Sequence, residues 1–167
     1  MTQKIKRNYL EINSLQDLKE VSKSSTDLTL NLLDPIDFQL NKFFYKNIGK
    51  KHKWIDRLIW TENQWIDYVS NKNVKTFLFK CKEDLAGFFE LILHSENKEI
   101  EIAYFGLLEE YQNKKLGSYL LSEAIKKSFE YNAKRVWLHT CSLDHKNALN
   151  NYITRGMKIF KSEIVII

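Results

Sequence analysis

A polar loop in the second half of the sequence carries residues that can bind an anion. The segment EEYQNKKLGSYLL, residues 109–121, places amides, two ammonium groups, a glycine and a hydroxyl before an amphipathic helical pattern. A helix N-terminus presents unpaired N–H groups and about half a positive charge, which suits a pyrophosphate. Taken alone, such a turn is more often only a turn. The candidate anion-binding residues are Gln112, Asn113, Lys114, Lys115, Leu116, Gly117 and Ser118.

Several side chains in the same half of the chain can move a proton. Tyr152, in DHKNALNNYITRG, has a phenol pKa of about 10 and can donate at neutral pH. Glu90 and Glu101 lie on neighbouring predicted strands and can act as a base through water. His139 has a pKa suited to proton transfer. The alternatives are a core position for Tyr152, on an apolar helix face, and a structural role for His139.

The segment NIGKKHKWIDRLIW, residues 47–60, combines aromatic rings with a guanidinium. Trp54, Arg57 and Trp60 can form an acceptor pocket with an aromatic wall and a cation for a carboxylate. The alternative interpretation, which we favour from sequence, is a core cluster in which Arg57 is paired to an acid. Tyr104 and His139 complete the set of candidate substrate-binding residues.

Charge and cysteine content limit the class of protein. The net charge of +5 favours anionic partners such as nucleic acid, anionic lipid or a phosphorylated cofactor. Cys81 and Cys141 belong to no CxxC or Cys/His cluster, which argues against a disulfide framework or a metal site. No secretory signal and no apolar run of about 20 residues is visible. We therefore expect a cytoplasmic protein that binds no metal and no membrane.

The hydrophobic patterns predict one mixed α/β domain over residues 1–167. A strand near KRNYLEI is followed by a short helix that Ser14 and Asp17 begin as a capping box. Residues 36–60 are expected to form irregular helices and loops. Thr61 and Gln64 repeat the capping pattern ahead of a helix that points Trp65, Ile66 and Val69 inward.

Alternating apolar runs dominate the chain after residue 74. NVKTFLFKC, LAGFFELIL and EIEIAYFGL are separated by short polar turns and predict an antiparallel meander. A helix follows from about Leu116 to Tyr131, then the strand RVWLHTCSL. A second helix is expected with Asp144 as its N-cap and Gly156 at its end. The strand SEIVII completes the order. Gly106, inside a predicted strand, marks a bulge or a close approach of another segment.

Two segments resemble the GNAT superfamily of N-acetyltransferases. YFGLLEEYQNKKLGSYLL is similar to its cofactor motif of strand, Gln/Arg-x-x-Gly-x-Gly/Ala and helix, with Gln112 first, Gly117 last and Lys115 in place of the first glycine. VWLHTCSLDHKNALNNYITRGM resembles the later strand–helix unit, in which an alanine, a tyrosine, a glycine and an apolar residue recur. His145 stands where the family often has asparagine. The matching residues there are Ala148, Tyr152, Gly156 and Met157.

The resemblance implies a fold and a reaction. The fold is a mixed, mostly antiparallel twisted sheet of six to seven strands with about four helices, whose strands splay at an acetyl-CoA cleft. The reaction is transfer of an acetyl group from acetyl-CoA to a primary amine, by direct attack in a ternary complex. The acceptor is expected to be a small molecule in preference to a protein, and the protein to be bacterial, a monomer or a homodimer.

The resemblance also assigns roles to residues. Tyr152 is implied as the acid for the leaving thiolate, and we prefer Glu101 to Glu90 as the base. Lys115 either adds a charge beside the pyrophosphate or crowds it. Further cofactor contacts are implied for Phe105, Leu107, Asn147 and Tyr152, with the Leu107 N–H polarising the thioester carbonyl.

The main alternative is a non-catalytic basic α/β module that binds RNA or another anion. Its cations would be Lys46, Lys50, Lys51 and Lys53. It predicts strongly salt-dependent nucleic-acid binding. No RNP-like or helix-turn-helix pattern supports this alternative. We therefore expect no nucleic-acid partner.

Overall fold

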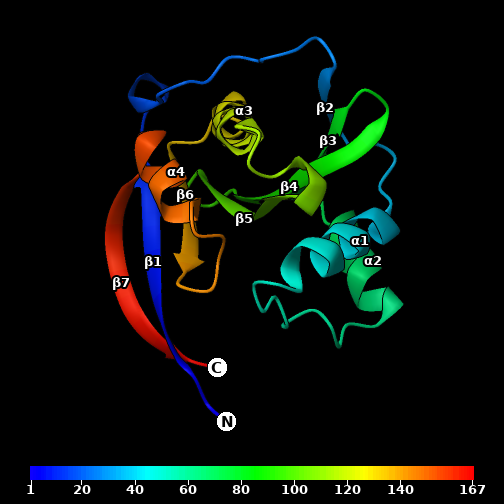
Figure 1. The fold of residues 1–167 in the computed structure, drawn as a ribbon, viewed down its shortest axis with the longest axis vertical. Helices are drawn as coiled ribbons and strands as arrows, with labels where there is room; N and C mark the ends of the chain where they lie inside the picture. Colours follow the sequence, from blue (N-terminus) through cyan, green and yellow to red (C-terminus); the bar gives the residue numbers. More distant parts are fainter.

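A single twisted sheet of seven strands organises the protein (Figure 1). The computed structural model describes residues 1–167. The strands lie in the order β2-β3-β4-β5-β6-β1-β7, and all neighbours are antiparallel except β5 and β6. Their bounds are β1 (Lys4–Ile12), β2 (Leu28–Leu32), β3 (Val74–Cys81), β4 (Asp84–His94), β5 (Glu99–Leu107), β6 (Arg135–Cys141) and β7 (Lys158–Ile166).

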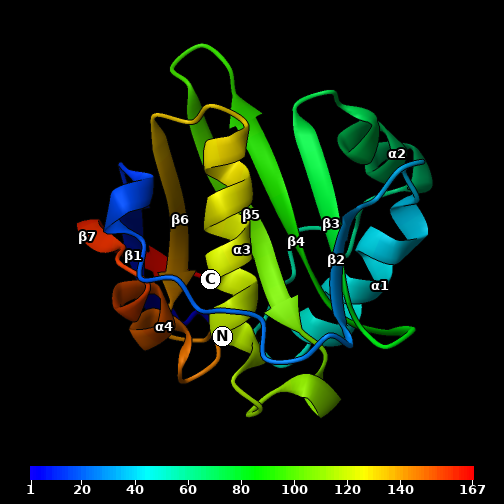
Figure 2. The same ribbon diagram turned by 90° about the horizontal axis from the view of Figure 1, so that it is seen from above.

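Four α-helices cover the two faces of the sheet. Helices α1 and α2 pack on one face over β3 and β4, and α3 and α4 lie on the other face (Figures 1 and 2). This arrangement confirms the expected mixed, mostly antiparallel sheet with about four helices. No helix is both long and apolar enough to cross a bilayer. The helices are α1 (Phe38–Gly49), α2 (Glu62–Ser70), α3 (Leu116–Glu130) and α4 (Ala148–Thr154), with 3-10 turns η1 (Leu15–Asp17) and η2 (Glu109–Tyr111).

The main core lies between the sheet and α3. The predicted apolar face of this helix is buried, and four of its residues are fully inaccessible to solvent. They pack against large side chains of β4 such as Phe89 and Leu91. Burial of this stripe, at about 25 cal/mol per Å² of apolar surface, holds α3 in place. The four residues are Leu120, Leu121, Ala124 and Ile125.

Helix α2 begins with the predicted capping box. The Thr61 hydroxyl accepts a hydrogen bond from the Gln64 backbone N–H, and the Gln64 side chain accepts one from the Thr61 N–H. Trp65 and Val69 are buried as predicted. The prediction for Ile66 was wrong, because this side chain is 39% exposed.

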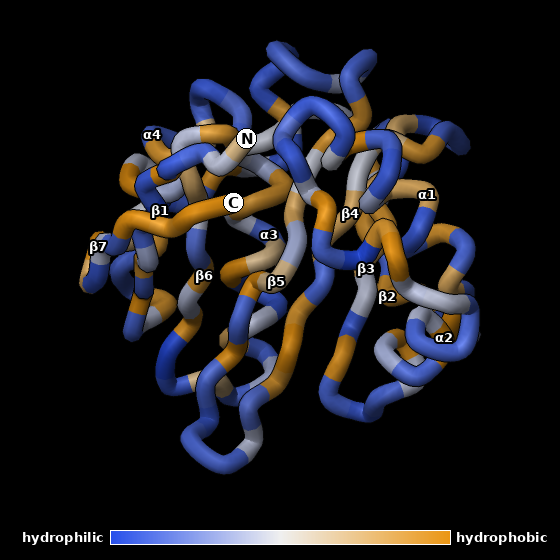
Figure 3. Tube along the Cα trace, turned by 90° about the horizontal axis from the view of Figure 1, so that it is seen from below, coloured by the Kyte–Doolittle hydropathy of each residue, from blue (hydrophilic) through white to orange (hydrophobic).

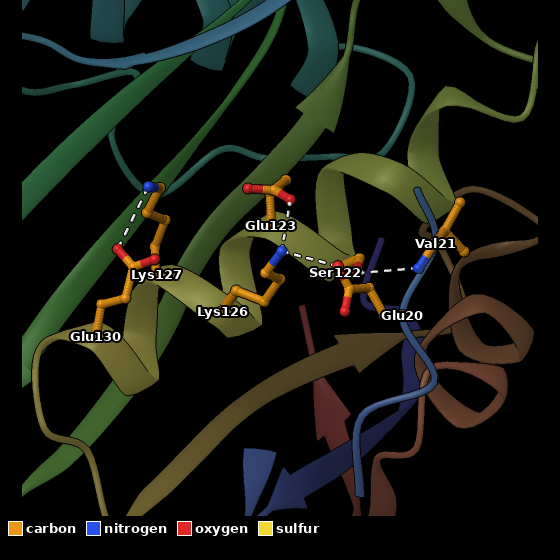
Figure 4. A network of polar contacts seen from close by, with 7 residues as sticks. All are labelled: Glu20, Val21, Ser122, Glu123, Lys126, Lys127 and Glu130. Atoms are coloured by element: carbon orange, nitrogen blue, oxygen red, sulfur yellow. Dashed lines mark hydrogen bonds and ion pairs between the residues drawn. The ribbon is translucent and has the colours of Figure 1, made fainter. Parts of the chain in front are cut away.

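The segment after β1 departs from the sequence prediction. Residues 15–17 form only the turn η1, whose N-cap Ser14 accepts from the Gln16 N–H. The expected α-helix is absent because tertiary contacts take its place. The Val21 N–H donates to the Ser122 hydroxyl at 3.2 Å, and the Lys126 ammonium binds Glu20 at 2.8 Å (Figure 4). These contacts lay the segment across α3.

Strand β1 lies between β6 and β7, so the two ends of the chain share one part of the sheet (Figure 1). Gln3 and Ile167 exchange backbone hydrogen bonds of 2.8 and 2.9 Å. The Lys6 carbonyl faces the other way, where it accepts from the Ser142 N–H beyond β6. Each edge of β1 therefore has a strand partner.

Candidate active site

Strands β5 and β6 are hydrogen-bonded over only part of their length. Glu99–Glu101 on β5 pair with Arg135–Trp137 on β6, although β5 continues to Leu107 and β6 to Cys141. The later part of β5 therefore has one backbone edge without a strand partner. A cavity of about 910 Å³ lies at this separation, lined by β5, β6, α4, the start of α3 and the loop between α1 and α2.

A backbone donor of β5 is directed into this opening. The Leu107 carbonyl accepts from the Gln112 side chain at 3.1 Å, whereas the Leu108 N–H donates to Ala86 on β4. Neighbouring residues of a strand alternate their backbone groups between the two edges. The Leu107 N–H therefore faces the cavity, where it can donate to a developing oxyanion. Gln112 fixes the loop against β5.

The loop before α3 turns through two left-handed residues. Asn113 has a φ of 61° and Lys115 a φ of 64°, and Lys115 is the N-cap of α3. No side chain caps this helix end, so its first-turn N–H groups remain free. Lys115 thus adopts the backbone conformation for which glycine is suited. Both residues line the cavity.

The left-handed conformation of Lys115 predicts a measurable strain. A Cβ in this region costs about 1 to 2 kcal/mol, and the greater freedom of glycine in the unfolded chain offsets about 0.5 to 1 kcal/mol of the gain. Lys115→Gly is therefore expected to be about 0.5 to 1 kcal/mol more stable than Lys115→Ala in urea unfolding. Both variants remove the charge, so the difference isolates the Cβ. Equal stabilities would contradict the strain.

Gly117 lies in the first turn of α3 with open space beside it. A Cβ built there would meet only Leu107 Cδ1 at 3.8 Å and Asn151 Nδ2 at 3.9 Å, which are ordinary contacts. The Asn151 amide also donates to the Gly117 carbonyl at 3.2 Å and joins α4 to α3. Two polar atoms of cavity-lining residues, Asn151 Oδ1 and Arg155 Nε, are buried without a hydrogen-bond partner.

Most of the predicted cofactor-binding residues line the cavity. Lys114 does not, and its ammonium lies over the Tyr111 ring at 5.7 Å. Leu116 is only 8% exposed and belongs to the core. The residues that line the cavity are Phe105, Leu107, Gln112, Asn113, Lys115, Gly117, Ser118, Asn147 and Tyr152.

Tyr152 brings a free hydroxyl to the wall of the cavity. The residue is 8% exposed, and its hydroxyl makes no hydrogen bond within the protein. Its ring meets that of Phe105 edge to face at 6.5 Å. Burial, with a smaller contribution from Asp144, raises the pKa of Tyr152 above its ordinary value. The phenol therefore stays protonated at neutral pH and can donate.

The two candidate carboxylates lie in different environments. Glu101 lines the cavity, with its side chain 18% exposed, and one of its oxygens lies 3.1 Å from His94 Nε2. Glu90 is fully buried beneath α1 and α2 and does not line the cavity. Its carboxylate is bonded to Arg57, Tyr68 and Asn41, and none of its surface is exposed to the cavity. The geometry therefore favours Glu101 over Glu90.

Glu90 is instead the centre of a buried polar network. Arg57 donates to it at 3.0 Å, the Tyr68 hydroxyl at 2.8 Å and the Asn41 amide at 2.8 Å. Burial opposes the charge of Arg57, but the combined effects of Glu90, Tyr68 and Tyr104 raise the pKa of the guanidinium. Five rings surround this guanidinium within 5.7 Å. They belong to Tyr45, Trp60, Trp65, Tyr68 and Tyr104.

Arg57 therefore combines the two roles considered from the sequence. It is paired to an acid in a core cluster, and it also lines the cavity together with Trp54 and Tyr104. The Trp54 and Tyr104 rings meet edge to face at 4.8 Å. The guanidinium, held among the rings by Glu90, fixes this aromatic wall.

His139 faces the same end of the cavity from β6. Its ring meets that of Tyr9 at 5.5 Å. Partial burial and the nearby charge of Arg7 lower the pKa of His139 below its ordinary value. Its imidazole is therefore neutral at pH 7 and available as a proton acceptor.

The lowered pKa of His139 predicts a pH dependence of stability. The unfolded chain binds the proton more tightly, so the stabilising contribution is present above pH about 6.5 and is lost as the pH falls through the lower pKa of the folded state. His139→Gln is expected to reduce the loss of unfolding free energy between pH 7 and pH 5. Urea unfolding across this range measures it. An unchanged slope would assign the acid sensitivity to other groups.

Several site features differ from the sequence predictions. Asp144 is not the N-cap of α4, which is Asn147; it accepts instead from the Thr140 hydroxyl and the Cys141 N–H. The bulge of β5 lies at Ala103, where the register with β4 shifts. Gly106 marks a close approach, since a Cβ there would lie 2.8 Å from Ile48.

Other residues line the cavity that were not predicted as part of the acetyl-transfer site. His52 contacts the Leu143 carbonyl at 3.0 Å, and Lys53 donates to the Gln3 side chain at 2.6 Å. These contacts join the α1–α2 loop to the β6–α4 loop and to the start of β1. Arg7 reaches the cavity because β1 lies beside β6. Such positions depend on the strand order, which no local pattern specifies.

Comparisons with known proteins give a consistent result. Residues 38–157 match the acetyltransferase (GNAT) family. No curated protein matches the sequence closely enough to count as a relative. Similar solved structures include a GCN5-related N-acetyltransferase from Sphaerobacter thermophilus. It has a TM-score of 0.73 and 13% identity, and the match covers 97% of this chain and 50% of that one.

Two further structures contain bound ligands. A Bacillus subtilis acetyltransferase in complex with CoA has a TM-score of 0.61 and 19% identity, with 80% of this chain and 78% of that one covered. An aminoglycoside acetyltransferase from an uncultured soil metagenomic sample, in complex with sisomicin, has a TM-score of 0.63 and 12% identity, with 77% and 87% covered. At these identities the likeness concerns the fold. The chain spans 50–62% of the length of the first four similar structures.

Proposed function

The chain belongs to the acetyltransferase (GNAT) family, and from this premise we propose that it transfers an acetyl group from acetyl-CoA to a primary amine of a small acceptor. The observation that carries the proposal is the cavity at the separation of β5 and β6. One cavity joins the uncapped start of α3, a free backbone N–H, a free phenol and an aromatic pocket. These are the groups that acyl transfer from a thioester to an amine requires.

The residues at the start of α3 fit a pyrophosphate. The free first-turn N–H groups and the helix dipole favour a doubly charged anion, and Lys115 adds an ammonium group. Asn151 and Arg155 also line the cavity, and each has a buried polar atom without a hydrogen-bond partner in the protein. Gly117 leaves the approach to the backbone open. Bound acetyl-CoA would supply the thioester whose carbonyl carbon is attacked.

The acceptor amine must lose a proton before it attacks. A lysine-like amine has a pKa of about 10.4, so about 4 kcal/mol opposes the neutral form at pH 7. Glu101 lies at the acceptor end of the cavity, with His94 against one of its oxygens, and we assign it the role of base through water. The Leu107 N–H stabilises the oxyanion.

Tyr152 is assigned the role of acid for the departing thiolate. Its hydroxyl has no partner in the protein, so Tyr152→Phe is expected to leave folding and acetyl-CoA affinity nearly unchanged. Turnover is expected to fall about 10- to 100-fold, at or below the lower limit of about 100-fold that is typical of acid catalysis, because a thiolate is already a fair leaving group. Steady-state kinetics and calorimetry measure the two quantities. If the variant turned over as fast as the original enzyme, Tyr152 would have only a packing role.

The acceptor end of the cavity favours a compact amine with an apolar body. Isoleucines line much of it, and Trp54 and Tyr104 form an aromatic wall. Asp56 and Glu101 are two of the carboxylates that line the cavity, and they are suited to attract a protonated amine before transfer. The isoleucines are Ile5, Ile48, Ile55, Ile92, Ile102 and Ile167.

Calorimetric titration with acetyl-CoA tests the proposal. Micromolar binding is expected, with a matched titration of a generic RNA at two salt concentrations as the control. The binding of acetyl-CoA would justify a screen of amines by release of free thiol. If the protein bound RNA in a salt-sensitive way and did not bind acetyl-CoA, the proposed acetyltransferase activity would be contradicted and the non-catalytic alternative supported.

A further inference from the structure

Strand β7 is an edge strand with apolar side chains exposed to solvent. Only β1 pairs with it. Four of its apolar side chains are between 42% and 64% exposed, and the apolar C-terminal end of the strand is visible in Figure 3. The strand contains no proline; it carries one bulge, at Phe160, and three charged residues among its apolar ones, and an exposed edge with apolar side chains can pair with another strand. The four residues are Ile159, Phe160, Ile164 and Ile166.

The hydrogen bonds to β1 determine which backbone groups of β7 are free. Gln3 and Ile167 exchange both of their backbone hydrogen bonds. In an antiparallel pair, bonded and non-bonded residues alternate. The N–H and C=O groups of Ser162, Ile164 and Ile166 therefore point away from β1, toward the open edge of the sheet. These groups are available to a second strand.

The sequence of β7 is complementary to itself in one antiparallel register. When two copies are centred on Ser162, Lys161 of each copy lies opposite Glu163 of the other, and the outward-facing backbone groups of the two Ser162 residues meet. The bulge at Phe160, where the register between β7 and β1 shifts, limits the regular pairing to the residues around this centre. Opposite charges across strands stabilise such a pair. This register also brings Phe160 next to Ile164 of the second copy. Centring on Glu163 would place this carboxylate opposite itself, and centring on Ile164 would leave both charges opposite apolar residues.

We propose that the chain forms a symmetric homodimer in which β7 pairs antiparallel with β7 of a second copy, centred on Ser162. A two-fold axis closes this interface, because the same strand supplies both sides. The two sheets then form one continuous sheet, and the central part of the β7 edge is covered. Strand β1, which supplies Ile5 and Arg7 to the cavity, lies directly beside the interface.

The interface is expected to be of moderate strength. A strand pair with flanking apolar contacts buries less than a standard protein interface of about 1,600 Å². Small interfaces are typical of weak complexes, so we expect a dissociation constant on the order of micromolar. Each chain contains its own cavity, so the dimer is separable from the proposed acetyl transfer. Loss of one would not imply loss of the other.

Sedimentation equilibrium of the full chain tests the dimer. Between about 1 and 100 µM the expected mass rises from 19.9 kDa toward twice that value. Ile164→Pro removes an N–H that makes no hydrogen bond within the chain. The variant is therefore expected to keep the circular dichroism spectrum of the original protein and to dimerise at least about tenfold more weakly. A wild-type protein that is monomeric at about 100 µM, or a folded Ile164→Pro variant that remains dimeric, would overturn the proposal.

Charge exchange tests the register independently of proline. Lys161→Glu and Glu163→Lys each place like charges opposite one another, so each is expected to weaken the dimer about tenfold. The double variant restores opposite charges and is expected to recover most of the affinity. Lys158→Glu is the matched control, because Lys158 would lie opposite Ile166. Recovery in the double variant supports the register, and a double variant as weak as the single ones would overturn it.

Discussion

Gly117→Glu is expected to weaken the binding of acetyl-CoA about 100-fold or more, equivalent to about 2.7 kcal/mol. The new carboxylate would lie in the first turn of α3, beside the free N–H groups that we assign to the pyrophosphate. It would repel the anion, and it would itself accept hydrogen bonds from the free N–H groups at the start of α3. Calorimetric titration with acetyl-CoA measures the loss.

The folded protein should accept this substitution. The Cβ at Gly117 meets only ordinary contacts, and a carboxylate near a helix N-terminus is favourable by about 0.3 to 1 kcal/mol. A loss of affinity through misfolding is therefore not expected, and thermal unfolding checks this. Gly117→Ala isolates the effect of bulk. Asn97→Glu, in the exposed β4–β5 turn, adds the same charge far from the cavity. An unchanged affinity of the Gly117→Glu variant would mean that the loop before α3 does not bind acetyl-CoA.

Glu90→Gln is expected to lower the free energy of unfolding by about 3 to 5 kcal/mol. The substitution keeps the shape of the side chain but leaves the guanidinium of Arg57 buried without its counter-ion. The Tyr68 hydroxyl and the Asn41 amide would also meet a weaker acceptor. For a protein with a typical total of about 5 to 15 kcal/mol, this is a large fraction. Urea unfolding followed by tryptophan fluorescence measures it.

Two controls separate this effect from catalysis. Glu101→Gln removes the same charge from a partly exposed position and is expected to change stability by about 0.5 kcal/mol or less. A double variant with Glu90→Leu and Arg57→Met removes both charges and should recover part of the loss, since apolar replacements of a buried pair are often neutral. If Glu90→Gln were as stable as Glu101→Gln, the buried network would have no stabilising role.

The elements with strong local signals were predictable from the sequence. The periodic apolar face of α3 and the capping box at Thr61 both specify helices through short-range contacts, and both are present. The strands of the meander are apolar runs separated by short polar turns, and they are also present. Local sequence patterns did not predict the structure correctly where contacts between distant segments determine it. The Ser14 turn does not extend into a helix because Glu20 and Val21 bind α3.

The candidate site was predictable in part. The loop before α3 and Tyr152 could be identified because each sits in a short stretch with a fixed spacing, and the structure brings them to one cavity. The different positions of Glu90 and Glu101 could not be foreseen, since both lie on apolar strands. Only the packing of α1 and α2 encloses Glu90. The left-handed conformation of Lys115 was likewise not visible, because lysine is not typical of it.

The position of β1 has a consequence for how the protein is made. A ribosome synthesises Lys4–Ile12 before the other strands of the sheet, yet the partners of this strand are β6 and β7, the two strands of the sheet that follow all the others. During translation β1 cannot form its strand pairs until β6 and β7 have been synthesised, so its backbone groups bond to water until then. Contacts between such distant parts of a chain form slowly. Strand β1 is therefore synthesised before its partners but can join the sheet only after them.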